Sequence, residues 1–118
     1  MINFRELEIW KRSFDLVNTV YEFTLQLPDN EKFGLTSQIR RCAVSMPSNI
    51  AEGCSRTSNK EIARFLEIAL GSSFELETQM LIAYRRKMLK SEQMRPTMDE
   101  LNQIQKMISA FRSHLLRN

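Results

Sequence analysis

The stretch SNKEIARFLEIALGSSFELETQMLIAY, residues 58–84, decides the fold of this chain. It begins with Ser58 and Glu61, which have the spacing of a capping box, in which the two side chains satisfy free N–H groups at a helix start. Along this stretch, residues that are mostly apolar recur every three or four positions. This period predicts one long α-helix, which we expect over residues 59–89. The positions that recur with this period are Ile62, Phe65, Leu66, Ala69, Ser73, Leu76, Met80, Ala83 and Tyr84.

The segments on either side repeat the same period. A first helix is predicted over residues 5–27, where two apolar stripes adjoin and Pro28 stops the helix. A second is predicted over residues 31–52, and a fourth over residues 98–116, after another capping box at Thr97 and Glu100. Three valines and three glycines leave little material for strands or hairpins. The pattern therefore predicts an all-α, antiparallel, up-down-up-down four-helix bundle.

Two residues of the second predicted helix are expected to affect its shape and its C-terminal end. Pro47 falls inside its apolar stripe and lacks the N–H that a helix needs, so we expect a kink or a break over residues 44–46. Gly53 is well placed to cap the C-terminal end of this helix.

Length and composition limit the class of protein. With 118 residues, of which 42% are apolar and 26% charged, the chain fits one globular domain over residues 1–118. No apolar run reaches the roughly 18 residues that span a bilayer, and the first residues lack the layout of a secretory signal, so we expect a cytoplasmic protein. Cys42 and Cys54 fit no metal or redox spacing and are interpreted as buried apolar residues.

No catalytic signature is present. The sequence contains no HExxH, GxSxG, GxGxxG or phosphate-binding glycine loop. The single histidine, His114, is interpreted as a surface or capping residue near the last helix end. Glu75 and Glu77 lie two positions apart and so point to different faces of a helix. We therefore expect no enzymatic activity, no metal and no cofactor.

Basic residues are the first feature with a functional interpretation. The net charge is +3, but the cations cluster along the chain. They can be ordinary solvated charges, or they can contact the phosphates of a nucleic acid, which is the main source of sequence-independent affinity. The candidate nucleic-acid-binding residues are Arg40, Arg41, Arg56, Lys60, Arg64, Arg85, Arg86, Lys87 and Lys90.

Two further features have structural interpretations. In the string SMPSNIAEG, residues 45–53, the polar side chains of Asn49 and Glu52 lie close to Pro47, and we expect them to bond backbone groups that the proline frees, with a ligand site as the alternative. Gly71 lies in mid-helix, which predicts close approach by a neighbouring helix or subunit. The first and third helices are also apolar over more of their circumference than one small bundle buries, which favours an oligomer.

The chain resembles the bacterial four-helix-bundle proteins of the 23S rRNA intervening-sequence type over residues 4 to 90. The resemblance is carried by Leu7, Trp10, residues 21–24, Phe33-Gly34-Leu35, Gln38, Arg40-Arg41, residues 45–53, Arg56, Ser58, Phe65-Leu66, Ala69, Gly71-Ser72 and residues 75–79.

This resemblance implies a homopentamer in a family with no established enzymatic activity. Similar proteins are accessory subunits of diversity-generating retroelements, where a basic pentameric barrel binds nucleic acid and a reverse transcriptase. Two departures are noted: Cys42 stands where alanine is usual, and +3 is less basic than those accessory subunits.

Two functions are therefore expected from the sequence. The first is a non-enzymatic homo-oligomer that binds RNA or DNA through its basic residues. The alternative is a protein-interaction scaffold without direct nucleic-acid contact.

Overall fold

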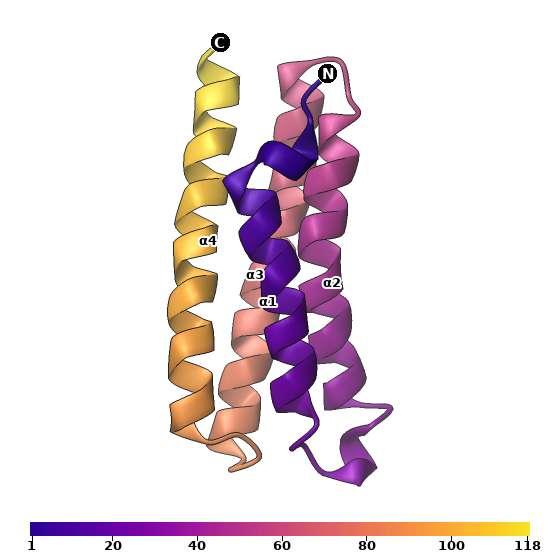
Figure 1. Ribbon diagram of the computed structural model, residues 1–118, viewed down its shortest axis with the longest axis vertical. Coiled ribbons are helices and arrows are strands. Elements are labelled where there is room, and N and C mark those ends of the chain that lie inside the picture. Colours follow the sequence, from indigo (N-terminus) through magenta and orange to yellow (C-terminus); the bar gives the residue numbers. More distant parts are fainter.

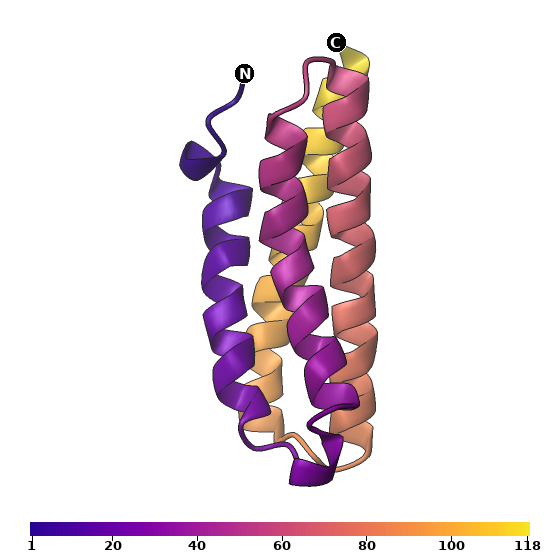
Figure 2. The ribbon, with the colours of Figure 1, turned by 90° about the vertical axis from the view of Figure 1, so that its right-hand side faces the viewer.

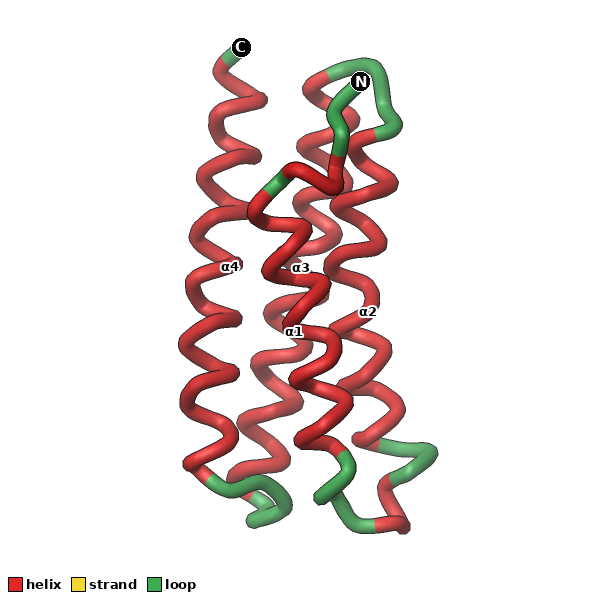
Figure 3. The backbone as a smooth tube through the Cα atoms, in the orientation of Figure 1, coloured by secondary structure: helices red, strands yellow, loops and turns green.

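The computed structural model describes residues 1–118 and contains four α-helices, two short 3₁₀ turns and no strand (Figure 3). The helices are α1 (Glu8–Thr24), α2 (Leu35–Cys54), α3 (Asn59–Arg85) and α4 (Ser91–Arg117). They run alternately up and down, and the bundle measures 45 × 23 × 20 Å (Figure 1). The all-α four-helix bundle predicted from the period of the apolar residues is confirmed.

Each helix packs against two others. α2 contacts α1 and α3, and α4 contacts the same two helices, whereas α1 and α3 lie on opposite sides (Figure 2). Side chains from all four helices meet along the axis, and the largest fully buried ones include Val20, Ile39, Met46, Leu66, Leu76, Met80, Leu101, Ile104 and Ile108. The exposed faces of α1 and α3 therefore point in opposite directions.

Helix α1 is shorter than predicted at both ends. Residues Phe4–Glu6 form a 3₁₀ turn, in which the side chain of Asn3 accepts a hydrogen bond from the N–H of Arg5, and Leu7 is extended before the helix begins. At the other end, the N–H groups of Leu25 and Leu27 bond the carbonyls three residues earlier. Tight i→i+3 bonds of this kind commonly finish a helix, so α1 ends before residue 27.

Helix α2 differs from the prediction at both ends, and it is not broken at Pro47. It begins at Leu35 rather than residue 31, because Asp29–Glu31 form a second 3₁₀ turn and the carboxylate of Glu31 accepts from the N–H of Leu35 at 3.2 Å. The helix then continues without a break through Pro47 to Cys54. Gly53 is inside the helix without a positive φ, so its prediction as the C-terminal cap was wrong.

The connection between α3 and α4 also differs. Ser58 caps α3 as predicted, with its Oγ accepting from the N–H of Glu61 at 3.1 Å. The helix ends at Arg85 instead of 89, because Lys87 adopts a left-handed φ of 62° and the N–H of Met88 bonds the carbonyl of Ala83. Helix α4 then begins at Ser91.

The predicted capping box before residue 98 was wrong, since Pro96 lies inside α4. Thr97 is buried and its hydroxyl donates to the carbonyl of Gln93 at 3.1 Å, which is a helix-interior bond and not a cap. Helix α4 therefore begins before Pro96, and the residues from Ser91 onward belong to the bundle.

Both cysteines are buried and free, as their spacing predicted. Burial raises the pKa of each thiol above its ordinary value. None of the four helices combines the length and the apolar character that crossing a membrane would require.

Candidate nucleic-acid interface

The nine predicted basic residues fall into two groups at opposite ends of the bundle. Helix α2 carries Arg40 and Arg41 near its start, and α3 ends at the turn that carries the second cluster, so both lie at the lower end in Figure 1. Arg56, Lys60 and Arg64 lie at the upper end, around the connection between α2 and α3. The structure therefore does not bring all nine residues together.

The most basic segment, residues 85–95, connects α3 to α4 and is named here the basic turn. It holds five basic residues and one acidic residue, Glu92, so its charge of +4 exceeds that of the whole chain. All five cations are exposed, and none makes an ion pair or a side-chain hydrogen bond within the chain. These cations are Arg85, Arg86, Lys87, Lys90 and Arg95.

The upper group is partly engaged by neighbouring side chains. Arg56 pairs with Glu52 at 3.2 Å and places its guanidinium 4.7 Å from the ring centroid of Phe65. Lys60 and Arg64 are exposed and form no ion pair. Two of the three predicted cations at this end are thus free.

Arg40 and Arg41 differ although they are adjacent. The Nε of Arg40 donates to the hydroxyl of Thr24 at 2.8 Å, and its guanidinium lies 4.6 Å from the ring centroid of Tyr21. Arg40 is therefore half-buried between α1 and α2. Arg41 is exposed.

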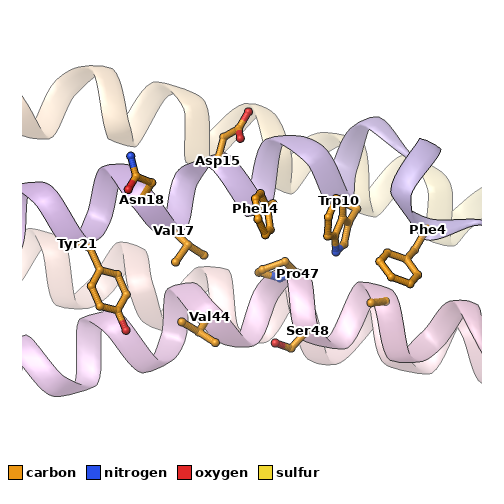
Figure 4. Close-up of a pocket in the computed structure, with 11 residues that line it drawn as sticks. Phe4, Trp10, Phe14, Asp15, Val17, Asn18, Tyr21, Val44, Pro47 and Ser48 are labelled. Carbon is orange, nitrogen blue, oxygen red and sulfur yellow. The ribbon is translucent and has the colours of Figure 1, made fainter.

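An apolar groove of about 810 Å³ runs between α1 and α2. The rings of Trp10 and Phe14 stack with centroids 4.9 Å apart and face Pro47 across the groove (Figure 4). Asp15 and Asn18 point away from α2 in the same view. Phe14 remains 56% exposed and Tyr21 41%, so this chain leaves part of the apolar surface of α1 uncovered.

Helix α3 also presents apolar side chains to solvent. Ile68, Phe74, Leu81 and Ile82 are each more than 40% exposed. Gly71 lies among them, and a Cβ added there would meet no atom within 4 Å. Close approach to Gly71 by a helix of the same chain, one of the two predicted explanations, is therefore excluded.

The string at residues 45–53 holds α2 against α3. Asn49 donates to the carbonyl and the hydroxyl of Ser45 at 2.8 and 2.9 Å, and the Ser45 hydroxyl lies 2.8 Å from that of Ser72 on α3. Gly53 is buried, and a Cβ there would lie 2.7 Å from the Cβ of Phe65. These contacts indicate that Asn49 and Gly53 stabilise the packing of α2 against α3.

Glu52, predicted to bond backbone freed by Pro47, is instead exposed and paired with Arg56. No group of three or more His, Cys, Asp and Glu side chains lies together in a way that could hold a metal ion. His114 is exposed near the end of α4.

Two features of the structure were not predicted from the sequence. Phe33 is 91% exposed beside Lys32, at the loop before α2, although an aromatic residue beside a cation and a glycine was visible in the sequence. Arg12 forms a two-pronged ion pair with Glu100 that links α1 to α4, with Nε to Oε2 at 2.9 Å. This hydrogen bonding raises the pKa of Arg12. Nothing local in the sequence signals a pair 88 positions apart.

The fold and its surface define an all-α bundle protein with an exposed cationic turn and uncovered apolar faces. The sequence profile of a family described as 23S rRNA-intervening sequence protein matches residues 5–110, and the chain belongs to this family.

One solved structure shows the same fold. It is the crystal structure of a protein of unknown function from the S23 ribosomal protein family of Bacteroides thetaiotaomicron, with a TM-score of 0.79 and 21% identity. The similarity covers 88% of this chain and 97% of that one. No curated protein matches the chain in sequence.

Proposed function

We propose that this protein is a non-enzymatic, homo-oligomeric accessory protein that binds RNA or DNA through phosphate contacts. The observation that carries the proposal is the basic turn: five exposed cations without intramolecular partners and only one acidic residue. Lys and Arg that neutralise phosphates release counterions from the nucleic acid, which supplies affinity without reading sequence. The name of the family, which refers to 23S rRNA, makes structured RNA the first ligand to test.

Not all predicted cations contribute equally in this proposal. Arg41, Arg85, Arg86, Lys87 and Lys90 form the principal set, because they are exposed at one end of the bundle. Lys60 and Arg64 form a second set at the other end, while Arg56 contributes less because Glu52 already neutralises it.

Self-association is the second part of the proposal. The groove between α1 and α2 and the exposed face of α3 lie on opposite sides of the bundle, so a contact between them joins one copy head to tail with the next. Contacts of this kind close into rings when the rotation permits. Five copies, the number that the resemblance implies, carry about +15 and repeat each weak phosphate site, which raises avidity.

The binding experiment is a filter-binding or mobility-shift series with structured RNA and with DNA, from low to high salt. We expect retention at low salt that falls steeply as salt increases. Absence of retention of either nucleic acid at low salt would overturn the proposal.

The oligomer has its own test. Light scattering at micromolar concentration should give a multiple of the 13.9 kDa chain. Phe14→Glu should lower that mass, because it puts a charge into the uncovered groove, whereas Lys11→Glu, which introduces the same carboxylate at an exposed position of α1 outside the groove, serves as the control. A wild-type monomer contradicts self-association.

A scaffold that binds a partner protein, such as a reverse transcriptase, is the alternative function. The uncovered apolar groove favours it, since exposed apolar patches of this kind mark protein contacts. In that case charge reversal at Arg85, Arg86 and Lys87 leaves nucleic-acid retention unchanged, and a pull-down recovers the partner.

A further inference from the structure

A second groove lies where the loop before α2 meets the C-terminal half of α1. It has a volume of about 470 Å³, within the range of small-molecule sites. Three basic residues and two aromatic residues line it, and no acidic residue does: Lys32, Arg40, Arg41, Tyr21 and Phe33. We name it the cationic groove. It shares Tyr21 and Val44 with the apolar groove, so the two grooves adjoin.

Phe33 is the most conspicuous side chain of the cationic groove. At 91% exposure it contributes nothing to the core, although an exposed phenyl ring is unfavourable in water. Its loop is bonded on both sides, with the N–H of Gly34 donating to the carbonyl of Glu31 at 3.0 Å and the N–H of Leu35 to the carboxylate of Glu31 at 3.2 Å. Hydrogen bonds therefore hold the backbone of this loop in place, while the ring of Phe33 is open to solvent.

A fixed cation also lines the groove. Arg40 is held by its bond to Thr24 and stacks on Tyr21, so its planar guanidinium is ordered before any ligand arrives. Lys32 lies 5.5 Å from the centroid of the Phe33 ring, and Arg41 is exposed beside Arg40. Three cations therefore line the same groove as the exposed aromatic ring of Phe33.

We infer that the cationic groove binds an unpaired nucleotide of single-stranded RNA or DNA. The base stacks on Phe33, and the flanking phosphates contact Lys32, Arg40 and Arg41. Sites for single strands combine these two elements, since every base has a π-face and every backbone has phosphates. The bases of a duplex are stacked within the helix and cannot use an aromatic platform. This inference rests on the proposed nucleic-acid function and names the form of its ligand.

The test compares Phe33→Leu with the wild type on fluorescein-labelled (dT)12, on U12 and on a 12-base-pair duplex, by anisotropy. Leucine keeps apolar volume but removes the stacking face, so affinity for both single strands should fall roughly tenfold. Affinity for the duplex should stay unchanged. Phe33→Trp should retain single-strand affinity, and its indole fluorescence should be quenched on binding. Leu116→Ala, at an exposed apolar residue of α4 that lines neither groove, is the control and should leave all affinities unchanged.

Several outcomes would overturn the inference. Equal losses on single strands and duplex, or no loss on either, show that Phe33 does not stack on a base. A change in assembly mass for Phe33→Leu by light scattering assigns the ring to a subunit contact instead. Poly-glutamate that competes in a Phe33-dependent way assigns the groove to an acidic peptide. Wild-type binding to the duplex alone removes this site but leaves the proposed function intact, whereas no binding to any nucleic acid removes both.

Discussion

The two ends of the bundle carry the same kinds of cation but hold them differently. At the α2–α3 end, Arg56 pairs with Glu52 and lies over Phe65, and Arg112 approaches Glu67 at 3.5 Å. In the basic turn at the other end, no cation has an acidic partner in the chain. The difference shows that the availability of charge depends on its neighbours in space, which net charge per chain does not report.

The largest expected effect is the loss of binding when the basic turn is neutralised. Replacing Arg85, Arg86 and Lys87 by Gln removes three unpaired cations, so the slope of log K against log salt should become shallower by about 2 to 3. Mobility shifts across a salt series measure this slope. The matched variant replaces Arg56, Lys60 and Arg64 by Gln and should change it less, because Arg56 is already neutralised. Equal changes in the two triple variants would erase the distinction between the ends.

The positions of the helices could be predicted from the sequence far better than their ends. The period of the apolar residues reflects which side chains are buried. Leu66, Leu76 and Met80 were predicted from this period to face the core, and all three are buried. The end of a helix depends on single hydrogen bonds, such as that from the N–H of Met88 to the carbonyl of Ala83. Alternative end positions differ little in energy, so the sequence pattern does not select among them. The capping box at Thr97 and Glu100 predicted a helix start near residue 98, whereas α4 begins at Ser91 and runs through Pro96.

The candidate site could be predicted only as a set of residue types. That the basic turn is cationic follows from its sequence, whereas the engagement of Arg40 by Thr24 and Tyr21 depends on how α1 meets α2. For the same reason, the sequence did not reveal that Phe33 and Arg41 line one groove. The up-and-down topology, which was predicted from the sequence, places the two groups of cations at opposite ends of the bundle.

The next largest effect concerns the close packing at the α2–α3 end. Gly53→Ala would place a methyl group 2.7 Å from the Cβ of Phe65, so the helices have to separate. Overpacking of this kind costs about 1 to 3 kcal/mol of the free energy of unfolding. Urea denaturation measures it. Gly71→Ala, where a Cβ meets no atom, is the control and should stabilise the isolated chain by roughly 0.5 to 1 kcal/mol. A neutral Gly53→Ala would contradict the close contact.

The opposite end carries a lysine where the backbone favours glycine. Lys87 has a φ of 62°, a conformation that is unfavourable for a residue with a Cβ. Lys87→Gly should therefore raise the free energy of unfolding by roughly 0.5 to 1 kcal/mol. Lys87→Gln removes the same charge but keeps the Cβ, so it should not stabilise. If both variants have equal melting temperatures, backbone strain at Lys87 plays no part in the α3–α4 turn.

The smallest effect comes from releasing the paired cation at the α2–α3 end. Glu52→Gln breaks an exposed i,i+4 pair with Arg56, which costs only about 0.3 to 0.5 kcal/mol in stability. Because Arg56 then lacks its acidic partner, nucleic-acid affinity should rise, by roughly twofold at low salt, and the gain should vanish at high salt. Anisotropy with the 12-base-pair duplex measures both. The double variant Glu52→Gln with Arg56→Gln should return to wild-type affinity, since the released cation is gone. A gain that persists in this double variant would place its origin in the removed carboxylate and would show that partner acids do not decide which end binds.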